Sequence, residues 1–374
     1  MIWVHCGDAS EITTTLSLAN RLIEHSDAAD VLVTCDAPHL SAFETLPSDV
    51  ICVEVPSDSP TKCRAFLDKW GPSYLIWNGG ALRPALLRQV ERSGIAATLI
   101  NARNAGLIPG GSRWLPRATR SAVSPFHRIL TADGATATRL MRGGVAAEQV
   151  EATGPILEEP IPLPHDQYEL TVMAEAFGAR PMWLAADVVQ SEVVHMAAAH
   201  MAASRKSHRL IMVLSPRDIG DGPKSAQVLR DAGFRVGVRS EGDDPEPEHQ
   251  VYVADLPDEL GLWYRLVPLT FMGGTMSGGG ASSPFEPILL GSAVVHGTRK
   301  SPHQTRFERL ASVQACREIR SASELGIAIS VLISPEQTAR MALAGWDEIT
   351  HNAETINRLI ETAMHGVARP EGAP

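Results

Sequence analysis

The sequence predicts an α/β protein made of two Rossmann-like halves. Short apolar runs alternate with longer segments of helical period, the alternation stops at one proline-rich stretch, and it then restarts. Such alternation is typical of βαβ units, whose strands form a parallel sheet. At 374 residues, the chain also exceeds the size at which one hydrophobic core usually stops growing, so two domains are expected.

The first half, residues 1–154, is expected to form the N-terminal Rossmann-like domain. A helix is predicted from Glu11 to His25, because apolar residues recur there at helical spacing, and Ser10 is a candidate N-cap. Strands are predicted at the apolar runs Ile2–His5, Val31–Thr34, Ile51–Val55, Tyr74–Trp77, Ala97–Asn101 and Arg128–Thr131.

Residues 155–165 are expected to be a linker, because this proline-rich stretch cannot sustain a helix or a central strand. The alternation restarts in residues 166–345, the expected second domain. Strands are predicted there at Met182–Ala185, Leu210–Ser215, Arg235–Arg239, Val251–Ala254, Leu269–Met272 and Ala293–His296, and helices at Glu192–Ala203 and Ala226–Ala232. Residues 346–374 are expected to form a C-terminal helix and tail, with a return to the first domain left open and Pro370–Pro374 frayed.

Composition excludes several classes of protein. A net charge of -10 disfavours a nucleic-acid-binding protein, because polyanions are repelled. The five cysteines form no CxxC pair and no metal-like spacing with histidine, so we expect free thiols in a reducing compartment and no metal site. The N-terminal residues do not resemble a signal peptide, and no apolar run is long enough to span a membrane. We therefore expect a cytoplasmic protein whose contact with the inner membrane, if any, is peripheral.

Two Rossmann-like domains joined by a linker describe the GT-B glycosyltransferase architecture, in which the domains face each other across a cleft that binds the ligands. The most informative segment follows the strand predicted at Leu269–Met272 and spans residues 273–287, GGTMSGGGASSPFEP. Its glycines allow close approach to a ligand, and Ser282 and Ser283 can cap a helix that begins near Pro284. Glu286 then falls in the first turn, where a carboxylate can accept hydrogen bonds from ribose hydroxyls.

Other candidate residues also follow predicted strands. Glu11 stands just after the first strand, where its carboxylate could take a proton from an attacking hydroxyl, and Asp8 is a second candidate base. The guanidinium of Arg217 could bind a phosphate or carboxylate. Each residue also has an ordinary structural explanation: a helix-terminal acid for Glu11 and a surface arginine for Arg217.

Several stretches resemble motifs of the 3-deoxy-D-manno-octulosonic acid (Kdo) transferases. The segment GGTMSGGGASSPFEPI resembles their GGSLVxxGGHNPLEPA, and HCGDASE near the N-terminus resembles HxxSxGE. Weaker similarity covers the stretches that begin at Asp255 (DTxGELxxxY), Pro181 (the strand before ASTHxGEE), Ser215 (PRHPER) and Leu99 (NARLS). The resemblance thus spans most of the chain.

The resemblance implies an inverting, metal-independent glycosyltransferase that moves Kdo or a related sugar from a CMP-activated donor to a lipid A-type or other envelope glycan. No cofactor is implied beyond the nucleotide-sugar donor. Glu11 would be the catalytic base. Donor binding would fall to Arg217, Gly274, Thr275, Met276, Ser282, Ser283 and Glu286, and the candidates for the acceptor or the cleft are Asp8, Ser10, Asn101 and Arg103.

The chain departs from the family pattern at several motifs. The family's acidic ExExWPN segment is replaced by WNGGALRP from Trp77 to Pro84, and the histidine and asparagine of GGHN are Ser282 and Ser283. We also expect no counterpart of the family's N-terminal membrane anchor. These departures leave two alternatives: a non-catalytic member that binds a nucleotide or glycan, and a GT-B enzyme that uses another nucleotide sugar. A nicotinamide-dependent oxidoreductase is disfavoured, because no GxGxxG follows the first strand.

Overall fold

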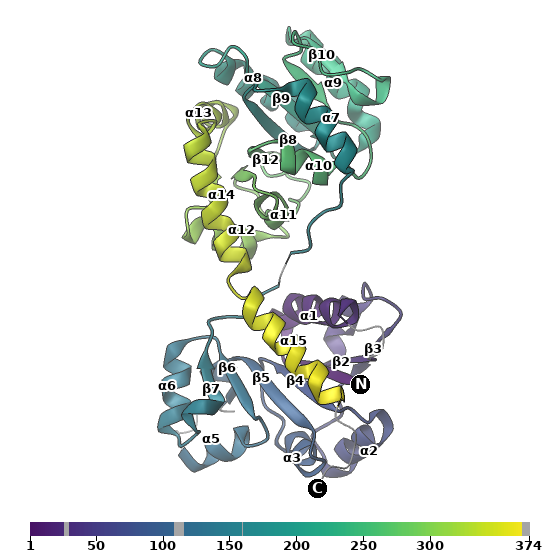
Figure 1. The fold of residues 1–374 in the computed structure, drawn as a ribbon, viewed down its shortest axis with the longest axis vertical. Helices are drawn as coiled ribbons and strands as arrows, with labels where there is room; N and C mark the ends of the chain where they lie inside the picture. The colour runs from purple at the N-terminus through teal and green to yellow at the C-terminus, as the bar shows by residue number, and fades with distance from the viewer. Residues whose placement is uncertain (26–29, 108–115, 159, 369–374) are drawn as a thin grey trace. The chain divides into compact units, whose positions relative to one another are not determined.

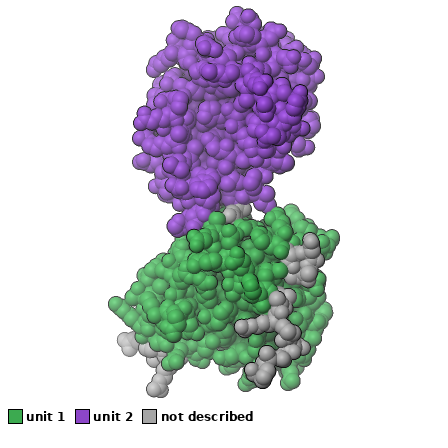
Figure 2. Space-filling model, in the orientation of Figure 1, with its two compact units in different colours: residues 1–159, 352–374 green, residues 160–351 purple. Residues whose placement is uncertain are grey.

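The computed structural model describes residues 1–25, 30–107, 116–158 and 160–368 (Figure 1). The chain divides into two compact units, of residues 1–159 with 352–374 and of residues 160–351 (Figure 2). The first unit therefore takes segments from both ends of the chain. The boundary expected at residues 345/346 falls inside helix α14 (Pro335–Thr350), and the predicted tail Pro370–Pro374 lies outside the described residues.

The first unit contains a parallel sheet of seven described strands in the order β3-β2-β1-β4-β5-β6-β7. The chain moves outward from β1 to β3 and then returns to β4 on the other side of β1, so the order reverses between β1 and β4. Ligands of open α/β sheets bind beside such a reversal, at the carboxyl ends of the strands. The strands are β1 Ile2–Cys6, β2 Val31–Cys35, β3 Val50–Glu54, β4 Tyr74–Asn78, β5 Ala96–Ala102, β6 Arg128–Thr131 and β7 Val150–Ala152.

Helices cover both faces of this sheet. Side chains alternate along each strand, so Trp3 and Trp77 enter the core on one face while Val4 and Ile76 enter the core on the other. The described helices are α1 Ile12–Glu24, α2 Pro60–Trp70, α3 Pro84–Arg92, α4 Asn104–Leu107, α5 Pro116–Val123, α6 Gly134–Arg142 and α15 Ala353–Ala368, with 3-10 turns η1 Ala9–Glu11, η2 Ala37–Phe43 and η4 Ala147–Gln149. The last of these helices, α15, packs against β1, β4 and α1 (Figure 1).

The second unit contains a parallel sheet of seven strands within its described residues, in the order β10-β11-β9-β8-β12-β13-β14. Here the order reverses between β8 and β12. The strands are β8 Met182–Val188, β9 Ile211–Pro216, β10 Val236–Val238, β11 Val251–Val253, β12 Leu269–Met272, β13 Ala293–His296 and β14 Cys316–Glu318.

The helices of the second unit lie before, between and after these strands. They are α7 Gln167–Phe177, α8 Val193–Ser204, α9 Gly222–Asp231, α10 Leu260–Leu266, α11 Phe285–Leu289, α12 Gln304–Ser312, α13 Ala322–Leu332 and α14. The 3-10 turns are η5 Gln190–Glu192, η6 Ile219–Asp221 and η7 Arg239–Glu241.

Sequence patterns located twelve of the fourteen described strands within a few residues, together with helices α1, α8 and α9. They missed β7 and β14, because each is a three-residue strand at a sheet edge whose side chains are not buried, so neither carries an apolar run. Most of the other helices between the strands were not predicted individually. The described part of the region predicted as a C-terminal helix and tail contains the end of α14 and helix α15, with a break at residues 351–352 between them. The segment predicted as a linker contains no helix or strand among its described residues.

Candidate active site

The turn after β1 brings Glu11 to the reversal point of the first sheet. The Asp8 carboxylate accepts the backbone N–H of Ser10 over 2.8 Å and so caps the 3-10 turn η1, which leads into α1. The prediction that Ser10 is the N-cap is therefore wrong. The Asp8 carboxylate already accepts the free N–H, and the Ser10 hydroxyl donates to that carboxylate over 2.5 Å. Glu11 ends the turn with only 2% of its surface exposed.

Two side chains bind the buried Glu11 carboxylate. Arg103 donates to Oε1 over 2.7 Å, and Asn101 donates to Oε2 over 2.7 Å. Burial raises the pKa of the Glu11 carboxyl above its usual range, while Arg103 and Asn101 lower it and the nearby Asp8 adds to the rise. A carboxylate with a raised pKa accepts a proton more readily, so the environment suits a general base.

Asn101 connects this carboxylate to the rest of the unit. Its amide nitrogen also donates to Asn78 Oδ1 over 2.9 Å and to the Ile156 carbonyl over 2.8 Å, while its oxygen accepts the Ile156 N–H over 2.8 Å. Asn101 has a left-handed backbone with a φ of 51°, and asparagine is one of the few non-glycine residues that tolerate this conformation. Asn101 and Arg103, which the sequence names as candidates for the acceptor or the cleft, therefore both form hydrogen bonds with Glu11.

Gly79 and Gly80 follow β4 beside this cluster. A Cβ atom at Gly79 would lie 2.8 Å from Glu11 Cγ, and one at Gly80 would lie 2.1 Å from the Gly7 carbonyl oxygen. Both residues have positive φ angles, 57° and 67°, so glycine is required for conformation as well as for space. Glycine at position 79 therefore leaves room for the Glu11 side chain, and glycine at position 80 allows the backbone to pass close to Gly7.

His5, a histidine at the end of the first strand, is a core residue. It is 2% exposed, its Nδ1 lies 2.9 Å from Thr34 Oγ1, and its ring packs against Trp77 with a centroid distance of 4.1 Å. Burial lowers the pKa of His5 to about 3, with a further contribution from Arg83. The imidazole is thus neutral at physiological pH, so His5 supplies no positive charge for binding a ligand.

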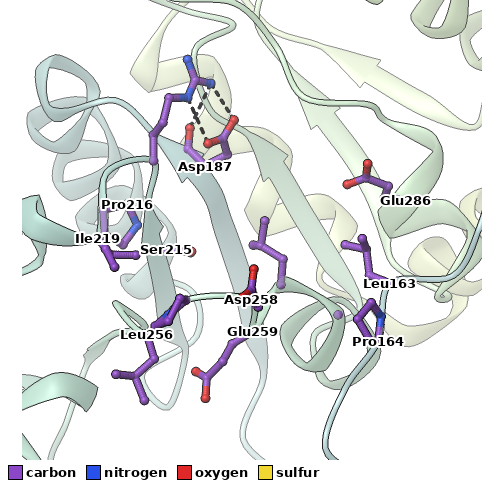
Figure 3. Close-up of a pocket in the computed structure, with 14 residues that line it drawn as sticks. Leu163, Pro164, Asp187, Ser215, Pro216, Ile219, Leu256, Asp258, Glu259 and Glu286 are labelled. Atoms are coloured by element: carbon purple, nitrogen blue, oxygen red, sulfur yellow. Dashed lines mark hydrogen bonds and ion pairs between the residues drawn. The ribbon is translucent and has the colours of Figure 1, made fainter. Parts of the chain in front are cut away.

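A pocket of about 320 Å³ opens at the reversal point of the second sheet (Figure 3). Asp187 and Glu286 contribute its carboxylates near the glycine segment. Its other lining residues come from the end of β9 and the turn after it, from the loop between β11 and α10 with the start of that helix, and from the chain before α7: Leu163, Pro164, Ser215, Pro216, Arg217, Ile219, Leu256, Pro257, Asp258, Glu259, Leu260 and Gly261. The predicted residues Glu286 and Arg217 are thus brought together on one pocket.

The first part of the glycine segment is turned toward the interior of the protein. Glu192, which is fully buried, accepts the backbone N–H groups of Gly274, Met276 and Ser277 over 2.7 to 2.9 Å. Thr275 is also fully buried, and its hydroxyl accepts the Gly297 N–H over 2.7 Å. Of the predicted donor-binding residues, Gly274 and Met276 therefore have their N–H groups engaged by Glu192, and Thr275 points away from the surface.

Arg217 is held by the protein as well. Its guanidinium forms a two-point ion pair with Asp187, over 3.0 and 2.6 Å, drawn as dashed lines at Asp187 in Figure 3. It also donates to the carbonyls of Gly279 and Gly280 over 2.7 and 2.8 Å. The hydrogen bond to Asp187 raises the pKa of Arg217 further above its usual value. In this structure Arg217 thus fixes the second part of the glycine segment, and Asp187 also accepts a hydrogen bond from Ser282.

The end of the glycine segment forms the helix expected there. The Ser283 hydroxyl accepts the Phe285 N–H over 3.3 Å at the start of α11, and Glu286 lies in the first turn of that helix. Burial raises the pKa of Glu286, Arg306 lowers it, and Asp187 raises it further. Glu286 is therefore a half-buried carboxylate on the pocket wall, in the position that the sequence predicts.

Sequence reasoning missed Asp187 and Glu192, the two carboxylates that hold the glycine segment. Asp187 lies near the end of β8 and Glu192 in the turn η5 that follows it, so the available signal was their place after the strand predicted at Met182–Ala185. Asp187 also has a left-handed φ of 54°, which the sequence does not reveal. Among the described residues, no group of three or more histidine, cysteine, aspartate or glutamate side chains could hold a metal ion.

Comparisons with known proteins find relatives of one name. A family model described as 3-deoxy-D-manno-octulosonic-acid transferase matches residues 1–157. The chain is 24% identical to the 3-deoxy-D-manno-octulosonic acid transferase of Haemophilus influenzae, over 96% of this chain and 86% of the relative. It is 22% identical to a probable mitochondrial enzyme of the same name from Arabidopsis thaliana, over 89% and 77%.

These matches support the Kdo transferase family. They indicate a glycosyltransferase, and the fold agrees: the crystal structure of Acinetobacter baumannii MurG matches 97% of this chain and 98% of its own with a TM-score of 0.51 at 10% identity. The predicted α/β fold of the GT-B type, with two Rossmann-like domains, is confirmed. No helix in the described part of the chain is long and apolar enough to cross a membrane.

Proposed function

We propose that the protein is an inverting transferase that moves Kdo, or a closely related sugar, from a CMP-linked donor to a lipid A-type or other envelope glycan. The observation that carries the proposal is the Glu11 carboxylate, which is buried beside the reversal point of a Rossmann-like sheet and held by Arg103 and Asn101. The relatives' names supply the sugar, since each is called a 3-deoxy-D-manno-octulosonic acid transferase.

In the proposed reaction, a hydroxyl oxygen of the acceptor attacks the anomeric carbon of the donor sugar. The bond from that carbon to the phosphate oxygen breaks on the opposite face, so the configuration inverts and CMP leaves with the bonding electron pair. Glu11 takes the proton of the attacking hydroxyl. Arg103 and Asn101 orient the carboxylate, and Asp8 and Ser10 remain candidates for contact with the acceptor.

The second unit would bind the donor. Glu286 is placed to accept hydrogen bonds from ribose hydroxyls, as acidic residues do in other nucleotide sites. Pro216, Ile219 and Leu256 give the pocket an apolar wall that suits the flat face of a nucleobase. Ser282, Ser283 and Arg217 would support the phosphate end through the shape of the glycine segment, with no cofactor or metal required.

The donor assignment can be tested by thermal unfolding with a panel of nucleotides and nucleotide sugars. Selective stabilisation by CMP and CMP-Kdo over UMP, UDP-sugars and GDP-sugars is expected, because a ligand that binds only the folded state raises the unfolding temperature. A shift with another nucleotide alone would instead favour a GT-B enzyme with a different donor. No shift with any cytidine nucleotide would refute the proposed donor.

The acceptor and the reaction can be tested together by mass spectrometry of envelope lipids from cells with and without the gene. Loss of a Kdo-sized mass from the lipid fraction, restored by the wild-type gene and not by a Glu11→Gln gene, is the expected result. Restoration by the Glu11→Gln gene would favour a non-catalytic family member that only binds its nucleotide or glycan.

A surface of the second unit supports contact with an anionic membrane, which would place the enzyme on the cytoplasmic face of the inner membrane. Helices α8 and α13 pack side by side, and their outer faces expose Val194, Met201, Ile327 and Val331. The turn after α8 adds the exposed basic side chains Arg205, Lys206, His208 and Arg209. Exposed apolar side chains beside basic ones are typical of surfaces that bind anionic lipids.

Co-sedimentation with vesicles tests this surface. Binding to vesicles of mixed phosphatidylglycerol and phosphatidylethanolamine, weakened by salt and by the double variant Arg205→Glu with Lys206→Glu, is expected. Equal binding of the wild type and the double variant would remove this surface as the site of membrane contact.

A further inference from the structure

Glu192 accepts hydrogen bonds from three backbone N–H groups of one short turn. Its Oε2 accepts from Gly274 over 2.7 Å, and its Oε1 accepts from Met276 over 2.9 Å and from Ser277 over 2.8 Å. Successive backbone N–H groups that converge in this way form a concave site for an anion. In this protein a side chain supplies the anion.

Burial makes this arrangement costly to disturb. Glu192 is 0% exposed, and a buried carboxylate without hydrogen-bond donors is strongly unfavourable. The three N–H groups provide those donors, and they would in turn be left unsatisfied without the carboxylate. Glu192 and the turn at residues 274–277 therefore stabilise one another.

The same loop is fixed at its second part by a separate pair of residues. Arg217 donates to the carbonyls of Gly279 and Gly280 while it is paired with Asp187. Gly278, Gly279 and Gly280 all have positive φ angles, between 89° and 106°, so the chain reverses sharply between the two attachments. Glu192 thus sets where the loop begins, and the pair of Arg217 and Asp187 sets where it ends.

We propose that Glu192 is a positioning residue that fills the N–H cradle of residues 274–277 as a built-in anion, so that the donor phosphate binds outside this cradle. The loop then has its final shape before the donor binds, so donor binding does not include the entropy cost of ordering the loop. The statement that the donor phosphate binds outside the cradle rests on the proposed function. The statement that Glu192 occupies the cradle rests on the hydrogen bonds alone.

The test is an anion-rescue experiment on Glu192→Ala. We expect the unfolding temperature to fall by roughly 5–10 °C, the size expected when three charge-assisted hydrogen bonds are lost from a domain of this length. Sodium formate should then recover at least half of that loss in a saturable way, because it supplies a carboxylate to the emptied cradle. Sodium chloride at equal ionic strength is the salt control.

Two variants serve as matched controls. Glu192→Gln keeps the shape of the side chain and one oxygen acceptor, so it should be less destabilised and should show no recovery with formate. Asp243→Ala removes another carboxylate of this unit, which accepts the backbone N–H of Val238 over 3.0 Å. Val238 belongs to β10, and three strands separate β10 from β12 in the sheet. It should be destabilised without any response specific to formate.

The donor step is tested on the same proteins by CMP binding. Glu192→Ala should bind CMP at least tenfold more weakly than the wild type, formate should restore the affinity, and formate should not compete with CMP. Competition between formate and CMP would show that the cradle is the donor phosphate site and would overturn the proposal. Absence of formate recovery in folded Glu192→Ala would overturn the occupation of the cradle.

Hydrogen exchange keeps the test decisive if Glu192→Ala does not fold. In the wild type, the amides of Gly274, Met276 and Ser277 should exchange slowly with and without CMP, and in Glu192→Gln at least one of them should exchange faster. Release of these amides by CMP in the wild type would contradict the proposal. Failure of the wild type to bind CMP would count against the proposed donor and would leave the formate result unaffected.

Discussion

The side-chain amide of Asn101 donates a 2.7 Å hydrogen bond to Glu11 from a backbone in the left-handed conformation. This hydrogen bond lowers the pKa of Glu11, against the larger effect of burial. Asn101 also holds both the N–H and the carbonyl of Ile156. One residue therefore fixes the orientation of the candidate base and part of its acidity.

Asn101→Gly removes the side-chain hydrogen bonds of Asn101 without adding backbone strain, because glycine adopts the same positive φ. We expect kcat/KM to fall by about 10- to 100-fold, less than the about 100- to 10,000-fold attributed to a complete general base, because the Glu11 carboxylate itself remains. The acid limb of the pH profile should move to higher pH, because a hydrogen bond to the charged carboxylate is lost. An unchanged acid limb in Asn101→Gly would argue that Glu11 is not the group that titrates.

Glu11→Gln should change stability in a pH-dependent way. The folded-state pKa of Glu11 is raised above its usual value, so its stabilising contribution is present below the ordinary pKa and is lost as pH rises through the raised one. The unfolding temperature of Glu11→Gln relative to the wild type should therefore increase with pH across this window. Thermal unfolding over a pH series measures this difference.

The control for that series is Glu44→Gln, which removes an exposed glutamate of the same unit. A Glu11→Gln difference that changes with pH no more than the Glu44→Gln difference would contradict the raised pKa. Transfer activity of Glu11→Gln should be lower by at least about 100-fold, with CMP binding retained, if the carboxylate is the base.

Glu286→Ala should remove the preference for ribose over deoxyribose. If the carboxylate binds the ribose hydroxyls, the variant should bind CMP about 10- to 100-fold more weakly, as expected for a lost hydrogen bond to a charged group. It should also no longer distinguish CMP from 2′-deoxy-CMP. Calorimetric titration of both nucleotides measures this, with Glu175→Ala, an exposed residue of α7, as the control.

The pH dependence of binding adds a second readout for Glu286. Its pKa is raised chiefly by burial, so wild-type affinity for CMP should decline as the pH falls through this raised value and the carboxyl becomes protonated. The affinity of Glu286→Ala should not show this decline. A wild-type protein that binds both nucleotides equally would contradict the ribose contact.

Arg217→Lys and Asp187→Asn should act as one unit. Lysine has no planar fork, so it cannot pair with Asp187 and with the glycine carbonyls at the same time. We expect each single variant to raise KM for the donor more than it lowers kcat, and the double variant to be little worse than either single one. Additive losses would instead favour a separate contact between Arg217 and the donor.

Local sequence patterns determined much of the fold. The strands around Val4, Ile76 and Leu184 are apolar runs followed by helical periods, and this local signal suffices because burial imposes it on every central strand. Family motifs placed Glu11 and Glu286 beside the carboxyl ends of β1 and β12. The glycine segment, its helix and the two-domain organisation also follow from the sequence.

Tertiary structure alone decided which side chains hold these residues. Glu192 meets the turn at residues 274–277 from more than 80 positions away, Arg103 reaches Glu11 across a separation of 92 residues, and α15 returns to the first unit from the end of the chain. Hydrogen bonds between such distant residues leave no periodicity in the sequence. They form only after the strand order of each sheet has brought the ends of β1 and β5, or of β8 and β12, to one edge.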